Sequence, residues 1–124
     1  MPSLIRIVAV GKIKEPYLRD GISEYAKRLR PLCRLEIVEL PDEGMEKEAA
    51  RLQKHLGPNT YVLDAAGKTT DSLQFALLVK KHSMGPLTFV IGSAEGADAS
   101  LKSKARLLSL SPMTFTHEMA RLVL

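Results

Sequence analysis

Leu87-Thr-Phe-Val-Ile-Gly-Ser-Ala-Glu-Gly96 is an apolar run that passes directly into a glycine-spaced loop. Its first five residues carry no charge and are mostly aliphatic or aromatic, which predicts a strand buried on both faces. Gly92 and Gly96 permit unusual backbone conformations and a close approach of backbone amides to a ligand. The segment therefore predicts a central strand with a candidate binding loop at its carboxyl end.

Strand and helix signals alternate through the rest of the chain. Further strands are expected at 4–10, 35–40, 60–65 and 107–113, and a loop at 66–70. Helices are expected from Pro16 to the stop at Pro31, at 46–56, from a cap formed by Asp71 with Gln74 to about His82, at 98–106 and from about Thr116. This alternation with short connections is typical of βαβ units. The predicted fold class is α/β, a mostly parallel sheet flanked by helices on both faces, in one domain over 1–124.

The composition is that of a globular chain, with 45% hydrophobic and 26% charged residues among 124. No apolar run approaches the roughly 18 residues of a membrane span, and no signal-peptide pattern is present. We therefore expect a cytoplasmic protein without a membrane partner. Cys33 is the single cysteine, which excludes a disulfide within the chain and a cysteine-based zinc site.

The net charge of +4 is unevenly distributed. Residues 1–34 hold eight Lys/Arg against three Asp/Glu, whereas residues 36–48 hold six Asp/Glu against Lys47 alone. A basic N-terminal third suits RNA or another polyanion. A solvated helix face is the alternative explanation, and the charge alone favours it.

Ligands of open α/β sheets bind beyond the carboxyl ends of the strands, so the loops at those ends carry the candidate sites. Asp64 ends one strand and could bind a ribose hydroxyl, although a turn or capping aspartate is the alternative. Leu110, Met113 and Phe115 alternate in the last loop. They could line an apolar pocket while the backbone faces an adenine edge. An edge strand followed by an N-cap at Thr116 is the simpler reading of that segment.

No other chemistry is indicated. Gly92-Ser-Ala-Glu-Gly96 is neither a G-x-G-x-x-G fingerprint nor a P-loop, and by itself it indicates only a strand-to-helix turn. No second His or Cys stands at metal-ligand spacing, so no metal is expected. His55 and His82 are expected on helix surfaces.

Several segments occur in an order and spacing that are specific in combination: Val8-Ala-Val-Gly-Lys12, Glu15-Pro-Tyr-Leu18, Glu24-Tyr25, Ile37-Val-Glu-Leu-Pro41, Leu63-Asp64, Gly67-Lys68, Phe89-Val-Ile-Gly92, Glu95-Gly96, Leu108-Ser-Leu-Ser111, Met113-Thr114, His117 and Arg121-Leu-Val-Leu124. In these segments, which span the whole chain, the protein resembles the ribosomal large subunit methyltransferase H family. That family belongs to the SPOUT class of knotted methyltransferases.

The resemblance implies transfer of a methyl group from S-adenosylmethionine to N3 of a pseudouridine in large-subunit ribosomal RNA. It also implies a homodimer whose partner is ribosomal RNA or the assembled ribosome. On this basis we expect His117 to orient or deprotonate the base, and Lys12 and Lys14, with Arg6 as the second choice, to hold RNA phosphates. The resemblance places the cofactor on Leu63, Gly92, Leu110, Ser111, Pro112, Met113, Thr114 and Phe115.

The chain differs from the family pattern at Ser93, where a second glycine is usual, and at Phe115-Thr116, where a Leu-Pro pair precedes the histidine. The family also continues past Leu124 with the rest of a helix and a tail that closes the active site. We expect a single SPOUT methyltransferase domain over 1–124 without that tail, and a trefoil knot if the C-terminus is complete. The alternative function is a noncatalytic RNA- or ribosome-binding module with the same fold. A nucleotide-binding protein with a small-molecule substrate is a third reading.

Overall fold

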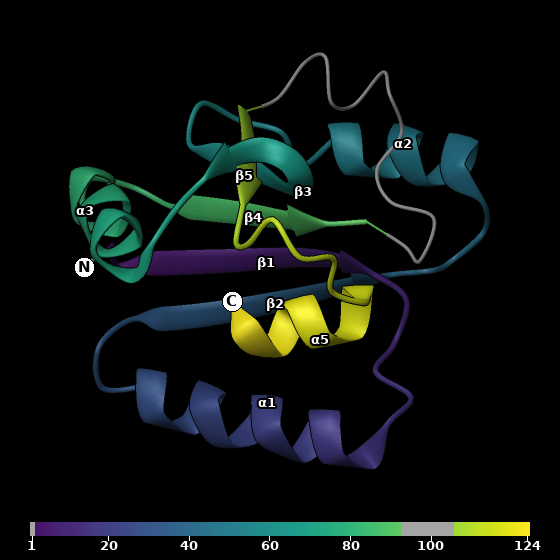
Figure 1. The fold of residues 1–124 in the computed structure, drawn as a ribbon, viewed down its shortest axis with the longest axis horizontal. Helices are drawn as coiled ribbons and strands as arrows, with labels where there is room; N and C mark the ends of the chain where they lie inside the picture. Colours follow the sequence, from purple (N-terminus) through teal and green to yellow (C-terminus); the bar gives the residue numbers. More distant parts are fainter. Residues whose placement is uncertain (1, 93–105) are drawn as a thin grey trace.

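The computed structural model describes residues 2–92 and 106–124. Its centre is a five-stranded sheet in the order β2-β1-β4-β3-β5, in which every neighbouring pair is parallel (Figure 1). This arrangement confirms the predicted parallel α/β sheet. The strands are β1 (Leu4–Val10), β2 (Arg34–Leu40), β3 (Thr60–Thr69), β4 (Leu87–Ile91) and β5 (Arg106–Ser109).

Helices cover both faces of the sheet, as predicted. Leu52 of α2 packs against Val8, Val62 and Val90 on one face. Phe75 of α3 and Leu124 at the end of α5 pack against the other face. The described helices are α1 (Pro16–Leu29), α2 (Met45–Gln53), α3 (Ser72–Lys81) and α5 (His117–Val123), and none is long and apolar enough to cross a bilayer.

The central position of β4 explains its sequence. All five of its residues are buried, because β1 and β3 pair with its edges and helices cover its faces. A strand that is buried on both faces is apolar throughout and lacks the alternation of polar and apolar residues seen where one face meets solvent. The candidate loop that begins at Gly92 therefore starts in the middle of the sheet.

Local signals place the helix starts correctly. Pro16 is at the first position of α1. Asp71 and Gln74 form a reciprocal capping box at the start of α3, in which each side chain accepts a hydrogen bond from the other residue's backbone amide. Cys33 is buried next to β2 and forms no disulfide.

The prediction for the end of β3 is wrong. The expected loop at 66–70 is largely strand, because β3 resumes its pairing with β5 at Lys68 after a bulge that begins at Leu63. Gly67 makes this possible. A Cβ atom there would lie 2.8 Å from the backbone of Leu107 and Leu108, so only glycine allows the two chains to come so close.

The predicted 107–113 strand is also too long. β5 ends at Ser109, and residues 110–116 leave the sheet as an irregular loop before α5. Arg106, which was expected to end a helix, is instead the first residue of β5. The rest of that expected helix, residues 98–105, and the loop residues Ser93 to Gly96 lie outside the described part of the chain.

Candidate functional site

A pocket of about 800 Å³ lies at the bulge of β3 and the carboxyl ends of β4 and β5, and the starts of α1 and α5 also line it. This is the sheet edge at which α/β proteins bind their ligands. Residues from three separate segments selected from the sequence, Leu63-Asp64, Gly92 and 110–115, meet here. The lining residues are Glu15, Tyr17, Leu18, Leu63, Asp64, Ala65, Ile91, Gly92, Ser109, Leu110, Ser111, Met113, Thr114, Phe115, Thr116, His117, Glu118 and Ala120.

The structure therefore brings together nearly all of the predicted cofactor residues. Leu63 and Gly92 come from β3 and the end of β4, which are neighbouring strands, and the loop after β5 contributes most of its residues from Leu110 to Phe115. Pro112 is the exception, since it belongs to that loop but does not line the pocket. Met113 and Phe115 are 75% and 36% exposed, so their side chains are available to a ligand.

Side-chain hydrogen bonds shape the loop that follows β5. The hydroxyl of Ser109 donates to the carbonyl of Ser111 over 2.8 Å, and the amide of Met113 donates to the hydroxyl of Ser111 over 3.0 Å. Within the described residues, no backbone–backbone hydrogen bond engages Ser111 to Phe115. Apart from the Ser111 carbonyl and the Met113 amide, the backbone groups of 111–115 have no hydrogen-bond partner among the described residues, which suits contact with a planar, hydrogen-bonding ligand.

Asp64 occupies the β3 side of the pocket, within the bulge. Its carboxylate accepts a hydrogen bond from the amide of Ala66 over 2.8 Å, which is the turn contact expected of an aspartate at this position. It also lines the pocket. The turn role and the predicted ribose-binding role are therefore compatible in the same side chain.

His117 is the first residue of α5 and lines the pocket beside Glu118. Thr116 caps this helix, since its hydroxyl accepts from the amide of Met119 over 3.1 Å. The carboxylate of Glu118 accepts hydrogen bonds from the backbone amides of Lys14 and Glu15, and the first of these lowers the pKa of Glu118 most. The pocket thus combines apolar walls with an imidazole and carboxylates at one end.

Sequence reasoning missed the contribution of the α1 start and of Glu118. Glu15 and Tyr17 line the pocket, and Tyr17 is 66% exposed. The segment Glu15-Pro-Tyr-Leu18 was one of the matching motifs, so its position in the resemblance could have drawn attention to it. For Glu118 the only signal in the sequence was its position directly after His117.

The predicted RNA-binding residues do not all lie together. Lys12 and Lys14 are exposed in the loop before α1, which Glu118 holds next to the pocket. Arg6 lies in the first half of β1 and forms an ion pair with Glu36 over 3.2 Å. Arg6 is therefore not part of the pocket or of its rim.

His82 corrects another expectation. It is buried, not exposed on a helix surface, because its ring packs against Tyr61 at the opposite end of the sheet from the pocket. No group of three or more potential metal ligands occurs in the part of the chain that the structure describes.

The structure is thus a parallel α/β protein with a pocket at the edge of its sheet, where the bulge of β3 lies beside the carboxyl ends of β4 and β5. A family model described as "Predicted SPOUT methyltransferase" matches residues 4–124. A protein of Streptococcus equi subsp. zooepidemicus named "Ribosomal RNA large subunit methyltransferase H" is 41% identical, over 97% of this chain and 87% of its own length. Proteins of the same name from Parasynechococcus marenigrum and Symbiobacterium thermophilum are 44% and 40% identical, over 99% and 97% of this chain and 85% and 88% of their own lengths. The chain belongs to the SPOUT methyltransferases and, within them, to the ribosomal RNA large subunit methyltransferase H family.

Proposed function

We propose that the chain transfers a methyl group from S-adenosylmethionine to N3 of a pseudouridine in large-subunit ribosomal RNA. One observation carries the proposal: Leu63 to Ala65 at the bulge of β3, Gly92 after β4 and the loop after β5 line a single pocket together with His117. The names of the relatives support ribosomal RNA as the substrate. The identity of the nucleotide and of the methyl donor rests on the family resemblance.

The residues in the pocket fit an adenosine-containing ligand. Leu63, Leu110 and Phe115 offer apolar side chains that could enclose the adenine ring. The remaining amides and carbonyls of 111–115, other than the Ser111 carbonyl and the Met113 amide, could form hydrogen bonds with the adenine edge. Gly92 lines the pocket without a side chain and leaves room for the ribose and methionine portions. S-adenosylmethionine, when bound, supplies a methyl group already activated by its attachment to a sulfonium.

The protein must then position the acceptor nitrogen and provide a group that accepts the proton that this nitrogen loses. N3 of the pseudouridine loses its hydrogen as it gains the methyl group, so a nearby proton acceptor or hydrogen-bond acceptor of the protein assists the transfer. His117 is the residue at the pocket wall suited to this role, because an imidazole nitrogen can hold N3–H in line or accept its proton. Lys12 and Lys14 would bind phosphates on the approaching strand.

Calorimetric titration of S-adenosylmethionine into the chain tests the cofactor assignment. We expect binding in the micromolar range, weakened at least about tenfold by Phe115→Ala because an aromatic wall is lost. Met84→Ala is the matched control, because Met84 is 87% exposed and does not line the pocket. Absence of binding by a folded sample would contradict the proposed cofactor.

Single-turnover methylation of unmethylated large ribosomal subunits tests the reaction. We expect methyl transfer by the unmodified chain and a loss of about 100-fold or more in His117→Ala, the usual size of a general-base contribution. RNA binding without S-adenosylmethionine binding or methyl transfer would instead identify the noncatalytic module. Such a result would reject the enzyme proposal.

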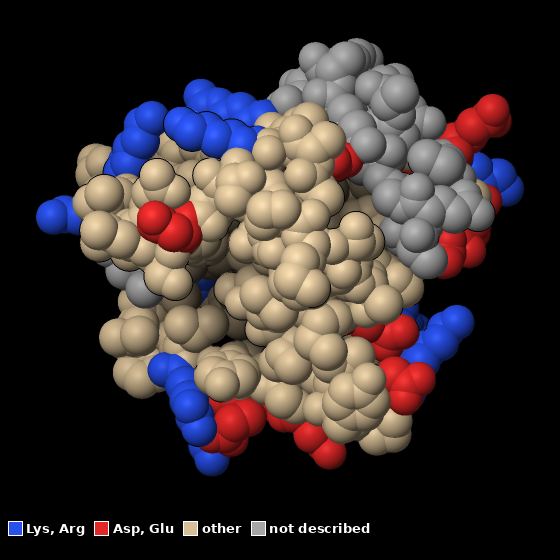
Figure 2. Space-filling model, viewed as in Figure 1, with Lys and Arg blue, Asp and Glu red and all other residues tan. Residues whose placement is uncertain are grey.

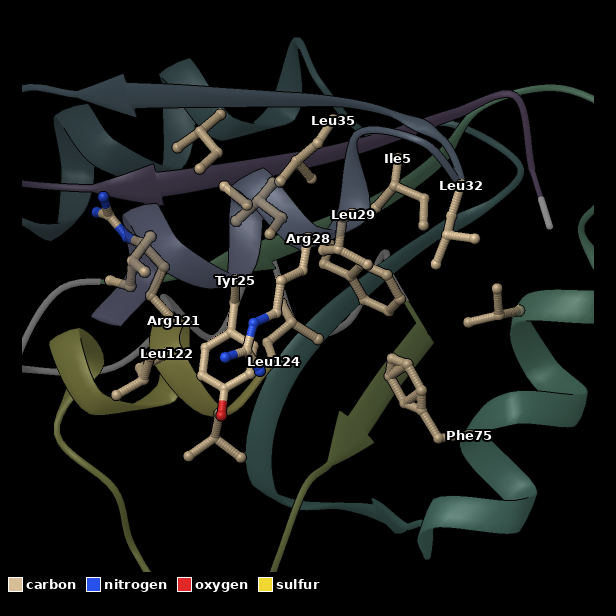
Figure 3. Close-up of a pocket in the computed structure, with 17 residues that line it drawn as sticks. Ile5, Tyr25, Arg28, Leu29, Leu32, Leu35, Phe75, Arg121, Leu122 and Leu124 are labelled. Atoms are coloured by element: carbon tan, nitrogen blue, oxygen red, sulfur yellow. The ribbon is translucent and has the colours of Figure 1, made fainter. Parts of the chain in front are cut away.

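We also propose that the chain acts in the cytoplasm, where ribosomes are found, and as a homodimer. A groove of about 660 Å³ between α1, α3, the sheet and the end of α5 supports the second proposal (Figure 3). Tyr25, Leu32 and Val123 line it, and each is more than half exposed. Figure 2 shows the hollow beside the end of α5, within a largely uncharged part of this face. An apolar surface of this kind is typical of a subunit interface.

A further inference from the structure

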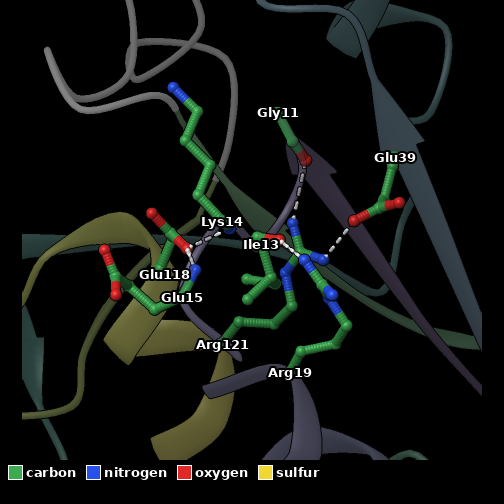
Figure 4. A network of polar contacts seen from close by, with 8 residues as sticks. All are labelled: Gly11, Ile13, Lys14, Glu15, Arg19, Glu39, Glu118 and Arg121. Atoms are coloured by element: carbon green, nitrogen blue, oxygen red, sulfur yellow. Dashed lines mark hydrogen bonds and ion pairs between the residues drawn. The ribbon is translucent and has the colours of Figure 1, made fainter. Parts of the chain in front are cut away.

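The loop of residues 11–15, which precedes α1, is fastened to α5 by a carboxylate that lies more than 100 positions away in the sequence. Oε1 of Glu118 accepts from the amide of Lys14 at 2.6 Å and from the amide of Glu15 at 3.3 Å. In Figure 4 the Lys14 side chain extends away from this carboxylate. Glu118 therefore binds the backbone of the loop and leaves the ammonium group to other partners.

A second side chain of α5 holds the other end of the same loop. Arg121, whose side chain is only 4% exposed, donates to Glu39 over 2.6 Å and to the carbonyl of Gly11 over 3.1 Å. Arg19 of α1 donates to the carbonyl of Ile13 over 3.1 Å, between these two points (Figure 4). The loop is thus attached along its length. Its hydrogen bonds to α5 come from Glu118 and Arg121, which lie about one helical turn apart.

The Glu118 contact differs from the others because it lies at the pocket. Glu118 follows His117 directly, and both line the pocket. Its charge also faces the start of α1, where the N-cap residue Glu15 makes no side-chain cap and the first turn holds no acidic residue. The hydrogen bond from the Lys14 amide, supported by that from Glu15, lowers the pKa of Glu118 and favours the charged carboxylate that accepts both bonds.

We propose that Glu118 is a positioning residue for the RNA substrate, which fixes the loop carrying Lys12 and Lys14 in a set place beside His117. The proposal rests on the proposed function, in which these lysines bind RNA phosphates and His117 meets the base. Both lysines are exposed, and no ion pair between described residues engages them. Holding the loop backbone in place aligns their phosphate contacts with the target base without Glu118 touching the RNA.

The test compares Glu118→Ala with Glu118→Gln in steady-state methylation of large ribosomal subunits. Alanine removes the acceptor, so we expect the KM for RNA to rise about tenfold or more while kcat at saturating RNA stays within about threefold. Glutamine keeps an oxygen for the two amides and should recover most of the loss. Glu46→Ala, which removes an exposed carboxylate from the first turn of α2, should behave like the unmodified chain.

Two further measurements separate positioning from general stability and from the proposed function. In Glu118→Ala the affinity for S-adenosylmethionine should fall by a clearly smaller factor than the KM for RNA rises, and hydrogen exchange should accelerate at the amides of Lys14 and Glu15. Two results would overturn the positioning role even if the unmodified chain methylates RNA. One is an unchanged KM for RNA in Glu118→Ala. The other is an equal loss of cofactor binding and RNA binding that Glu118→Gln does not restore. Failure of the unmodified chain to methylate RNA overturns the proposed function, and the positioning role with it.

Discussion

The phenol oxygen of Tyr61 and Nε2 of His82 share a hydrogen bond of 2.7 Å, inside the protein and away from the pocket. Arg106 donates to the same phenol oxygen over 3.2 Å. Burial, followed by the charges of Lys81 and Arg106, lowers the pKa of His82 and so favours its neutral form.

This relationship predicts an acid-sensitive fold. The pKa of His82 in the folded state lies below its ordinary 6.5, so the unfolded chain binds the proton more readily. The stability from neutral His82 is present above pH 6.5 and is lost as the pH falls through the folded-state value. We expect urea unfolding at pH 7.5 and 5.0 to show this loss, and His82→Gln to reduce it. His55→Gln is the control and should keep the pH dependence of the unmodified chain.

The close contact at Gly67 predicts a marked sensitivity to a single methyl group. Gly67→Ala would bring Cβ within 2.8 Å of the β5 backbone, where no flexible side chain can move aside. We expect a loss of about 1–3 kcal/mol in the free energy of unfolding, measured in urea. Gly57→Ala is the matched control, because its Cβ would meet nothing closer than 3.7 Å. Equal stability of the two variants would contradict the packing described here.

The two exposed lysines before α1 predict a change in the salt dependence of RNA binding. Lys12→Ala combined with Lys14→Ala removes two phosphate contacts, so the slope of log K against log salt should become shallower by about 1.5. Fluorescence anisotropy with a ribosomal RNA fragment at several salt concentrations measures this slope. Lys80→Ala combined with Lys81→Ala removes the same charge from the last turn of α3, away from the pocket. If both double variants change the slope equally, the binding is not local to the loop.

The groove between α1 and α5 predicts where a dimer would be disrupted. Leu32, which is 60% exposed, lines the groove, and Leu32→Asp would place a charge in the proposed interface. We expect this variant to be a folded monomer in light scattering coupled to size-exclusion chromatography. Leu73→Asp changes a residue that is 72% exposed on α3 but outside the groove, and should leave the mass unchanged. A monomeric unmodified chain would refute the dimer itself.

Local chemistry explains why much of the fold and site could be predicted. The apolar run from Leu87 to Ile91, Pro16 at a helix start, and the Asp71–Gln74 capping box each depend on residues a few positions apart. Because parallel strands end at one sheet edge, the alternation of strands and helices was enough to predict that the segments at Leu63, Gly92 and Leu110 would meet, although Leu63 lies at a bulge within β3 and not in a loop.

Features that depend on distant contacts could not be predicted in the same way. The continuation of β3 to Thr69 depends on the register between Lys68 and Leu108, which no local pattern encodes. The burial of His82 depends on Tyr61, which lies 21 positions earlier in the chain.

The sequence alone therefore determined the class of fold, the order of its elements and the loops that form the pocket, because propensity, capping and hydrophobic periodicity act over a few residues. Only the tertiary structure decided which side chains support that pocket. The Glu118 carboxylate reaches the amides of Lys14 and Glu15 because the sheet places the start of α5 beside the start of α1. A hydrogen bond between groups more than 100 residues apart is set by packing, and neither partner carries a local signal for the other.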